Sequence, residues 1–197
     1  MNAPIPVVIL AGGQGSRMGG NKAERRLAGK TLLEHAIAKA SIYSPAVAIS
    51  TGKDMWLPPD EYAVFQDKGD IEGPIAGLAA ALEFARAAGA EHVLILPCDT
   101  PFLPDDLLQR LHGAIGDTRA TLARCAGQLH PACSLWRIDS SSRLSEYLVQ
   151  GRRSLVGFAE SAGYIPVDWP DSSANLFFNV NTADDLLQAE RFYSELL

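Results

Sequence analysis

The sequence has few cysteines and no long hydrophobic run, and each shortage excludes a class of protein. Its three cysteines, Cys98, Cys125 and Cys133, are odd in number and show no C-x-x-C spacing, which argues against a disulfide framework or a zinc knuckle. No apolar stretch approaches the ~20 residues of a membrane-spanning helix, and the first residues lack the basic segment of a secretory leader. We therefore expect a cytoplasmic protein with reduced thiols and no membrane partner.

An excess of positive charge is also missing. The chain holds 17 Lys and Arg against 23 Asp and Glu, for a formal net charge of −6, which argues against general nucleic-acid binding. Residues 14–30 reverse this balance, because their charged side chains are Arg17, Lys22, Glu24, Arg25, Arg26 and Lys30. A local basic patch on an acidic protein favours a small polyanion as the ligand.

No composition shift marks a linker or a second domain. The 197 residues, 47% hydrophobic and 20% charged, suffice for one well-packed core. We therefore expect a single domain over residues 1–197. Strand-like and helix-like segments alternate along it, which predicts an α/β fold with layers around a mostly parallel sheet.

Hydrophobic periodicity and turn residues place the expected elements. The expected strands are 7–10, 46–49, 64–65, 92–96, 132–137 and 164–167. The expected helices are 32–40, 75–88, 105–111, 143–149 and 182–196. Pro74 suits the first turn of its helix. Thr182 is a good N-cap for the last helix, with Asp184 and Asp185 well placed on its dipole.

A glycine-rich loop follows the first expected strand. Residues 7–10 are all apolar, as in a strand buried on both faces of a parallel sheet, and they precede Gly12, Gly13, Gly15, Arg17, Gly19, Gly20 and Lys22. Because glycine has no Cβ, the backbone can pass close to an anion and point its N–H groups at it. The pattern predicts a phosphate-binding loop at the carboxyl edge of the sheet. A plain glycine-rich turn is the alternative.

This loop matches neither of two common phosphate fingerprints. G-x-G-x-x-G fails because Gly19 comes one residue late after Gly13 and Gly15. The P-loop pattern G-x-x-x-x-G-K-[ST] could end at 29–31, but Glu24 stands where its first glycine belongs. The loop therefore indicates another class of nucleotide-binding protein.

Asp99 stands just past the expected strand 92–96, between Pro97 and Pro101, which keep the chain extended. The end of a parallel strand places its carboxylate at the same sheet edge as the glycine loop. Magnesium prefers one or two carboxylates together with substrate phosphates. Asp99 is thus a candidate metal ligand, and a cap for the following helix is the alternative.

The run L-A-G-G-x-x-x-R-M-G-x-x-K, from Leu10 to Lys22, resembles the signature of the molybdenum cofactor guanylyltransferase family of GT-A-like nucleotidyltransferases. Nearly the whole chain shares the resemblance, through Gly73-Pro74-Ile75-Ala76-Gly77, Pro97-Cys98-Asp99-Thr100-Pro101, His130-Pro131, Gly151-x-Arg153 and Asn179-Val180-Asn181-Thr182. The resemblance implies a three-layer, Rossmann-like, mostly parallel sheet with helices on both faces. It also implies an antiparallel excursion in the second half.

The same resemblance implies an activity. GMP would pass from GTP to the terminal phosphate of molybdopterin or molybdenum cofactor, releasing pyrophosphate and forming the guanine dinucleotide cofactor. Mg²⁺ on Asp99 would bridge phosphates, while Lys22 and Arg17 would stabilise the charge of the transition state. No covalent nucleophile is needed, because the attacking group is itself a phosphate. Molybdoenzymes or their chaperones are implied as further partners.

The N-terminal half would bind GTP. The loop residues assigned to the nucleotide are Leu10, Ala11, Gly12, Gly13, Gly15 and Lys22. The missing methyl group at Gly12 leaves room for a purine, and Asp67 matches a family acid near the ribose and base. The chain departs from the family at residues 50–52, where many members carry an asparagine, which puts one base contact in doubt.

The C-terminal half would bind molybdopterin. Arg153 could offer a planar fork to the acceptor phosphate, or could cap the preceding helix instead. Asn181 is a candidate second contact to the metal or phosphates, with Asn179 beside it, although both could simply tie off turns. His130 lies in a segment that the family uses near the pterin.

Two other functions stay open on the residues. The first is a different nucleotidyltransferase, acting on CTP and molybdopterin or on a sugar phosphate; Gly12, His130 and Arg153 favour the guanylyl reaction. The second is a non-catalytic nucleotide-binding partner of molybdoenzyme assembly. Retention of both Lys22 and Asp99 argues against it.

Overall fold

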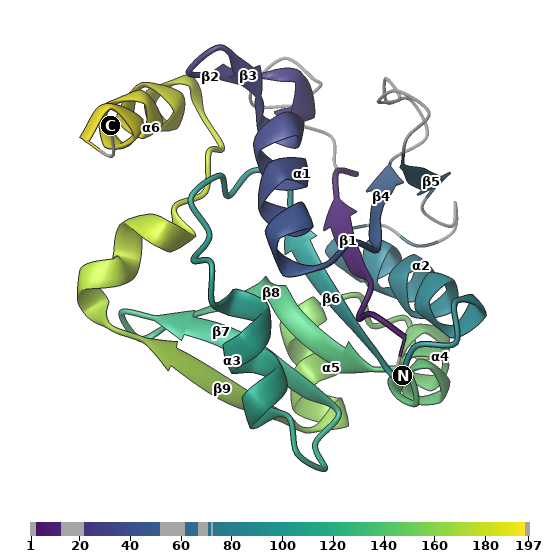
Figure 1. The fold of residues 1–197 in the computed structure, drawn as a ribbon. Helices are drawn as coiled ribbons and strands as arrows, with labels where there is room; N and C mark the ends of the chain where they lie inside the picture. Colours follow the sequence, from purple (N-terminus) through teal and green to yellow (C-terminus); the bar gives the residue numbers. More distant parts are fainter. Residues whose placement is uncertain (1–2, 13–21, 52–61, 67–70, 72, 196–197) are drawn as a thin grey trace.

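A seven-stranded sheet forms the centre of the protein in this computed structural model, which describes residues 3–12, 22–51, 62–66, 71 and 73–195 (Figure 1). Its strand order is β5-β4-β1-β6-β8-β7-β9. The strands are β1 (Val7–Leu10), β4 (Val47–Thr51), β5 (Ala63–Gln66), β6 (His92–Pro97), β7 (Ala120–Cys125), β8 (Gln128–Arg137) and β9 (Tyr164–Trp169).

Strand directions confirm the expected mostly parallel sheet. β1 runs parallel to β4 and β6, β5 runs parallel to β4, and β9 runs parallel to β7. β8 pairs antiparallel with both β6 and β7. The antiparallel excursion therefore lies in the second half of the chain, as the family resemblance implies.

Helices cover both faces of the sheet, which confirms the three-layer architecture (Figure 1). The helices are α1 (Leu32–Tyr43), α2 (Pro74–Ala87), α3 (Leu107–Ala114), α4 (Ser140–Val149), α5 (Leu155–Ala162) and α6 (Ala183–Glu195). Val7 and Ile9 of β1 pack into the core under α1 and α3. Val8 and Leu10 alternate with them and pack under α2, α4 and α5. All four residues are buried, as a strand covered on both faces requires.

A short hairpin precedes α1 and fixes its start. The hairpin pairs β2 (Arg26–Leu27) with β3 (Lys30–Thr31). The Thr31 hydroxyl accepts a hydrogen bond from the Glu34 N–H at 3.1 Å, and the Glu34 carboxylate accepts one from the Thr31 N–H at 2.5 Å. This reciprocal capping box satisfies two amides that the first turn would otherwise leave unpaired.

The last helix, α6, packs on this hairpin rather than on the sheet (Figure 1). Its Ala189 shares a small core with Leu27 of the hairpin and with Val180. Its Glu190 carboxylate accepts a hydrogen bond from the Ala28 N–H at 2.9 Å. Segments from the two halves of the chain are thereby held side by side.

Among the strands of the main sheet and the α-helices, β7 and α5 lie outside the sequence predictions, and so do the short hairpin strands β2 and β3. β7 joins β8 through Ala126 and Gly127, whose φ angles of 49° and 73° fit a tight hairpin turn with two left-handed residues. Alanine is an uncommon residue in that position, so the turn gives a weak sequence signal. α5 is short and contains Gly157. No helix among the described residues is long and apolar enough to cross a membrane.

Candidate active site

The carboxyl ends of β1 and β6 form the switch point of the sheet. After β1 the chain builds β4 and β5 on one side, and it returns on the other side as β6. Leu10 and Pro97 are register partners, and the Cys98 N–H donates to the Leu10 carbonyl at 3.2 Å. In open α/β sheets, ligands bind where the strand order reverses in this way. The loops that follow β1 and β6 therefore leave the sheet at the expected binding edge.

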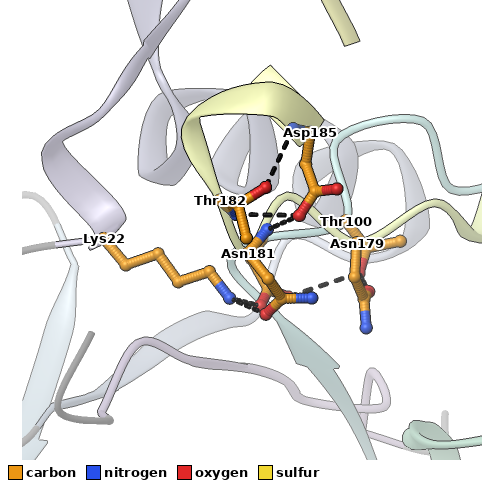
Figure 2. Close-up of polar contacts among 7 residues, drawn as sticks. Lys22, Thr100, Asn179, Asn181, Thr182 and Asp185 are labelled. Atoms are coloured by element: carbon orange, nitrogen blue, oxygen red, sulfur yellow. Dashed lines mark hydrogen bonds and ion pairs between the residues drawn. The ribbon is translucent and has the colours of Figure 1, made fainter. Parts of the chain in front are cut away.

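Three distant segments meet at this edge around the Lys22 ammonium (Figure 2). Lys22 begins the short 3-10 helix η2 (Lys22–Glu24), Asp99 follows β6, and Asn181 precedes α6. Lys22 Nζ donates to Asp99 Oδ2 and to Asn181 Oδ1. The Lys22 and Asp99 side chains are only 19% and 16% exposed, so solvent screens their attraction less than at an open surface. The structure thus brings together three residues that the sequence singles out.

Asp99 is oriented by its neighbours. The buried Thr100 hydroxyl donates to Asn179 Oδ1 and lies 3.4 Å from Asp99 Oδ1. The Val180 N–H donates to the Asp99 carbonyl at 2.8 Å. Val180 is buried, while Asn179 and Asn181 on either side are exposed. Both asparagines contact side chains of the site, Asn179 through Thr100 and Asn181 through Lys22. Because α3 begins only at Leu107, Asp99 is too far along the chain to cap it.

Asp185 supports the same turn from the first turn of α6 (Figure 2). Its carboxylate oxygen Oδ2 accepts from the Asn181 N–H at 2.9 Å and from the Thr182 N–H at 2.8 Å. The Thr182 hydroxyl accepts in return from the Asp185 N–H at 3.1 Å, which confirms Thr182 as the N-cap. Burial opposes ionisation of Asp185, but these hydrogen bonds and the Lys22 charge outweigh it and lower its pKa.

The oxygens of the site fit a divalent cation. Asp99 Oδ2 and Asn181 Oδ1 converge on one positive charge, the Lys22 ammonium. A carboxylate and an amide oxygen are hard ligands of the kind that Mg²⁺ and Ca²⁺ prefer. Within the described part of the chain, no group of three or more His, Cys, Asp or Glu side chains forms a cage. A cation held here would therefore share its coordination with substrate oxygens, as Mg²⁺ commonly does.

The three cysteines are free and buried. Burial raises the pKa of Cys98 to about 12 and also raises the pKa of Cys133. Because only the thiolate is a strong nucleophile, neither thiol takes part in covalent chemistry beside Asp99.

His130 lies in an aromatic cluster. Its ring stacks on Phe177 with a centroid distance of 4.7 Å, and Phe177 meets Trp169 edge-on. Burial lowers the pKa of His130 and so favours its neutral form. The cluster joins β8 and β9 to the 3-10 helix η3 (Asp171–Phe177), which leads into the Asn179 turn.

Arg153 caps a helix in this structure. Its guanidinium donates to the carbonyl of Leu148, near the end of α4, at 2.8 Å and to the carbonyl of Arg152 at 2.9 Å. This is the helix-capping arrangement that the sequence left open. In the described residues, Arg153 makes no hydrogen bond or ion pair with Lys22, Asp99 or the asparagines.

Several predicted nucleotide contacts lie outside the described residues. They are Gly13, Gly15, Arg17 and Asp67. Leu10 and Ala11 are buried at the end of β1, and the following Gly12 is exposed. α2 packs closely on Leu10: a Cβ added to Gly77 would lie 2.7 Å from Leu10 Cδ2.

Sequence reasoning gave Thr100 and Asp185 no part in the site. Thr100 belongs to a quoted motif, but only the fold reveals its contact with Asn179. Asp185 was considered only for its effect on the helix dipole. The spacing of Thr182 and Asp185, a hydroxyl followed three residues later by a carboxylate, was the available signal.

The fold and the site define a nucleotidyltransferase of the GT-A-like class, and comparison with known proteins narrows this class to a family. The MobA-like NTP transferase domain matches residues 7–162. The molybdenum cofactor guanylyltransferase of Cereibacter sphaeroides is 37% identical over 189 residues, covering 93% of this chain and 94% of that protein. The Haemophilus influenzae protein of the same name is 35% identical over 195 residues, covering 94% and 97%. The chain belongs to the molybdenum cofactor guanylyltransferase family.

Solved structures show the same architecture. Molybdopterin-guanine dinucleotide biosynthesis protein A from Archaeoglobus fulgidus superposes with a TM-score of 0.77 at 25% identity, covering 97% of this chain and all of that one (100%). The 2-C-methyl-D-erythritol 4-phosphate cytidylyltransferase from Thermus thermophilus superposes with a TM-score of 0.74 at 19% identity, covering 98% and 100%. The second likeness concerns the fold alone.

Proposed function

We propose that the protein transfers GMP from GTP to the terminal phosphate of molybdopterin or molybdenum cofactor, with release of pyrophosphate. The observation that carries this proposal is the meeting of Lys22, Asp99 and Asn181 at the switch point of the sheet. The names of relatives that share over a third of their residues with this chain support GTP as the donor. The three buried, free thiols favour the cytoplasm as the compartment.

The reaction needs alignment and neutralisation of charge rather than a protein nucleophile. An oxygen of the acceptor phosphate attacks the α-phosphorus of GTP, and pyrophosphate leaves. Lys22 supplies a mobile positive charge to the phosphates, where charge spreads in the transition state. The Val180 N–H holds the backbone of Asp99 in place during the transfer.

Asp99 and Asn181 would hold the divalent cation, which we propose is Mg²⁺. When bound, this ion would supply positive charge that neutralises the phosphates. The two protein oxygens already face a common cationic group. Asp185 restrains the backbone of Asn181, and the Thr100 hydroxyl lies against the Asp99 carboxylate.

The remaining contacts divide between the two substrates. For GTP, we propose the backbone of Gly12, Gly13 and Gly15 on the triphosphate, Arg17 on the charge of the transition state, and Asp67 near the ribose and base. For molybdopterin, we propose Asn179 and Arg153. Arg153 would then have to exchange its bond to the Leu148 carbonyl for the acceptor phosphate.

A transfer assay tests this function directly. The purified protein is incubated with Mg²⁺, molybdopterin and GTP labelled at the α-phosphate, and label in the dinucleotide product is measured. Parallel reactions contain CTP or UTP, or a sugar phosphate as the acceptor. Label should enter molybdopterin from GTP in strong preference to the others. Preferential transfer from CTP, or transfer only to a sugar phosphate, would overturn the assignment.

A further inference from the structure

The turn that carries Asn181 has little packing to hold it. Val180 is fully buried, but the next four residues, 181–184, are all exposed. No apolar side chain in that stretch inserts into a core. The direction in which Asn181 points therefore depends on the hydrogen bonds of its backbone.

Asp185 makes those hydrogen bonds. One carboxylate oxygen, Oδ2, accepts from two successive amides, those of Asn181 and Thr182. A helix cap needs only the amides of the helix's first turn, and the Asn181 N–H lies before that turn. The bond to Asn181 thus reaches beyond α6 and into the active site, to the residue whose side-chain amide oxygen contacts Lys22.

We infer that Asp185 is a positioning residue, which holds the Asn181 backbone so that the Asn181 amide oxygen faces Lys22 and Asp99. The inference rests on the proposed role of Asn181 in binding the cation and phosphates. Asp185 itself touches neither Lys22 nor Asp99 by a described hydrogen bond or ion pair. It acts through Asn181.

The acceptor oxygen matters more than the charge in this arrangement. In Asp185→Asn, the amide oxygen can take the place of Oδ2 and still accept from both N–H groups. In Asp185→Ala, both amides lose their acceptor. The exposed neighbour Asp184 lies in the same helical turn and carries the same charge, so Asp184→Ala is a matched control for charge on the helix dipole.

The experiment measures kcat, KM for GTP and melting temperature for Asp185→Ala, Asp185→Asn, Asp184→Ala, Asn181→Ala and the double variant of Asp185→Ala with Asn181→Ala. We expect Asp185→Ala to lower kcat/KM by about tenfold, the lower end for groups that orient ligand side chains. Asp185→Asn should restore most of the activity. Asp184→Ala should stay within about twofold of the parent, as surface changes away from such features usually do.

The double variant separates positioning from stability. If Asp185 acts through Asn181, then Asp185→Ala should cost no further activity once Asn181 is alanine. An undiminished tenfold loss on the Asn181→Ala background would overturn the inference, and so would failure of Asp185→Asn to restore activity. Full activity of Asn181→Ala would remove the proposed role of Asn181 and the inference together. A defect in Asn181→Ala with full activity in Asp185→Ala would overturn the inference alone.

Discussion

Gly77 of α2 lies against Leu10 of β1 so closely that a Cβ on it would come within 2.7 Å of Leu10 Cδ2. Real Cβ atoms do not approach other atoms that closely, so an alanine at this position would force Leu10 or α2 to move. Ala11 and the exposed Gly12 follow Leu10 directly. This close contact thus lies next to the residues that lead into the proposed phosphate loop.

We predict that Gly77→Ala lowers the free energy of unfolding by about 1–3 kcal/mol, because overpacking forces Leu10 or the helix to move. Thermal and urea denaturation measure this change. Gly113→Ala in α3 is the matched control, since a Cβ there meets nothing within 4 Å. Alanine should stabilise that helix by roughly 0.5–1 kcal/mol. Equal effects of the two substitutions would contradict this account.

Asp99→Asn should abolish GMP transfer while the protein stays folded, because an amide is a poor substitute for a carboxylate that binds a divalent cation. The transfer assay and a melting curve measure the two properties separately. Asp105→Asn removes an exposed carboxylate that pairs with Lys39 and should leave turnover unchanged. Near-normal turnover of Asp99→Asn at ordinary magnesium would exclude Asp99 from metal binding.

Lys22→Met should weaken triphosphate binding and slow transfer by roughly 10²-fold or more, the scale for losing one charge-stabilising donor. Methionine retains much of the length of the side chain without its charge. Lys39→Met is the control, because Lys39 pairs with Asp105 away from the site. If affinity for GTP and the rate both stay within about twofold of the parent, Lys22 contributes nothing beyond its resting ion pair with Asp99.

Arg153→Ala tests whether this arginine serves the acceptor or the helix. We predict a raised requirement for molybdopterin with GTP affinity unchanged, because a guanidinium suits a phosphate better than a carbonyl. Calorimetry with GTP and a titration of molybdopterin measure the two affinities. Loss of both affinities to the same degree, with a lower melting temperature, would show that the bond to Leu148 is its whole function.

The protein should lose stability as the pH falls below about 6.5, the ordinary pKa of histidine. Burial, followed by the nearby His112, lowers the pKa of His92, and burial lowers that of His130. Below that pH these histidines bind more protons in the unfolded chain than in the folded protein. The free energy of unfolding therefore declines as the pH falls from about 6.5 towards the lower pKa values of the folded state. The charges of Glu91 and Asp139 act to raise the pKa of His92, and the charge of Arg137 acts to lower it.

Urea denaturation at pH 7.5, 6.5 and 5.5 would measure this decline. Replacing His92 and His130 by glutamine should flatten the dependence over that interval, because glutamine does not titrate. An unchanged slope would show that other groups set the acid sensitivity. The carboxylates with lowered pKa, such as Asp168, lose their contribution only in a more acidic range.

The sequence predicted the layered fold and most of its elements because their signals are local. The apolar run of β1 and the hydroxyl of Thr182 each act on neighbouring residues, and both expectations are confirmed. The tight turn at Ala126 and Gly127 was missed because its left-handed alanine is uncommon. Local patterns fail where an uncommon residue occupies a strained position.

The site was predictable only in its parts. Lys22 and Asp99 are 77 residues apart, and Lys22 and Asn181 are 159 apart, so no pattern along the chain specifies their contact. The sequence allowed Arg153 either to bind the acceptor phosphate or to cap the preceding helix, and only the fold shows its bond to the Leu148 carbonyl. The bond of Asp185 to the Asn181 amide depends on the path of a short turn, which composition does not specify.

The docking of α6 on the β2–β3 hairpin affects when the enzyme can fold during its synthesis. Domains fold as units during synthesis, yet the lysine of this site emerges from the ribosome long before its asparagine partner. Until the Asn181 turn and α6 have been translated, Leu27 of the hairpin lacks part of its core. A nascent or prematurely terminated chain would therefore contain Lys22 without Asn181, the residue that accepts its second hydrogen bond. Activity should therefore appear only once the Asn181 turn and α6 have been translated.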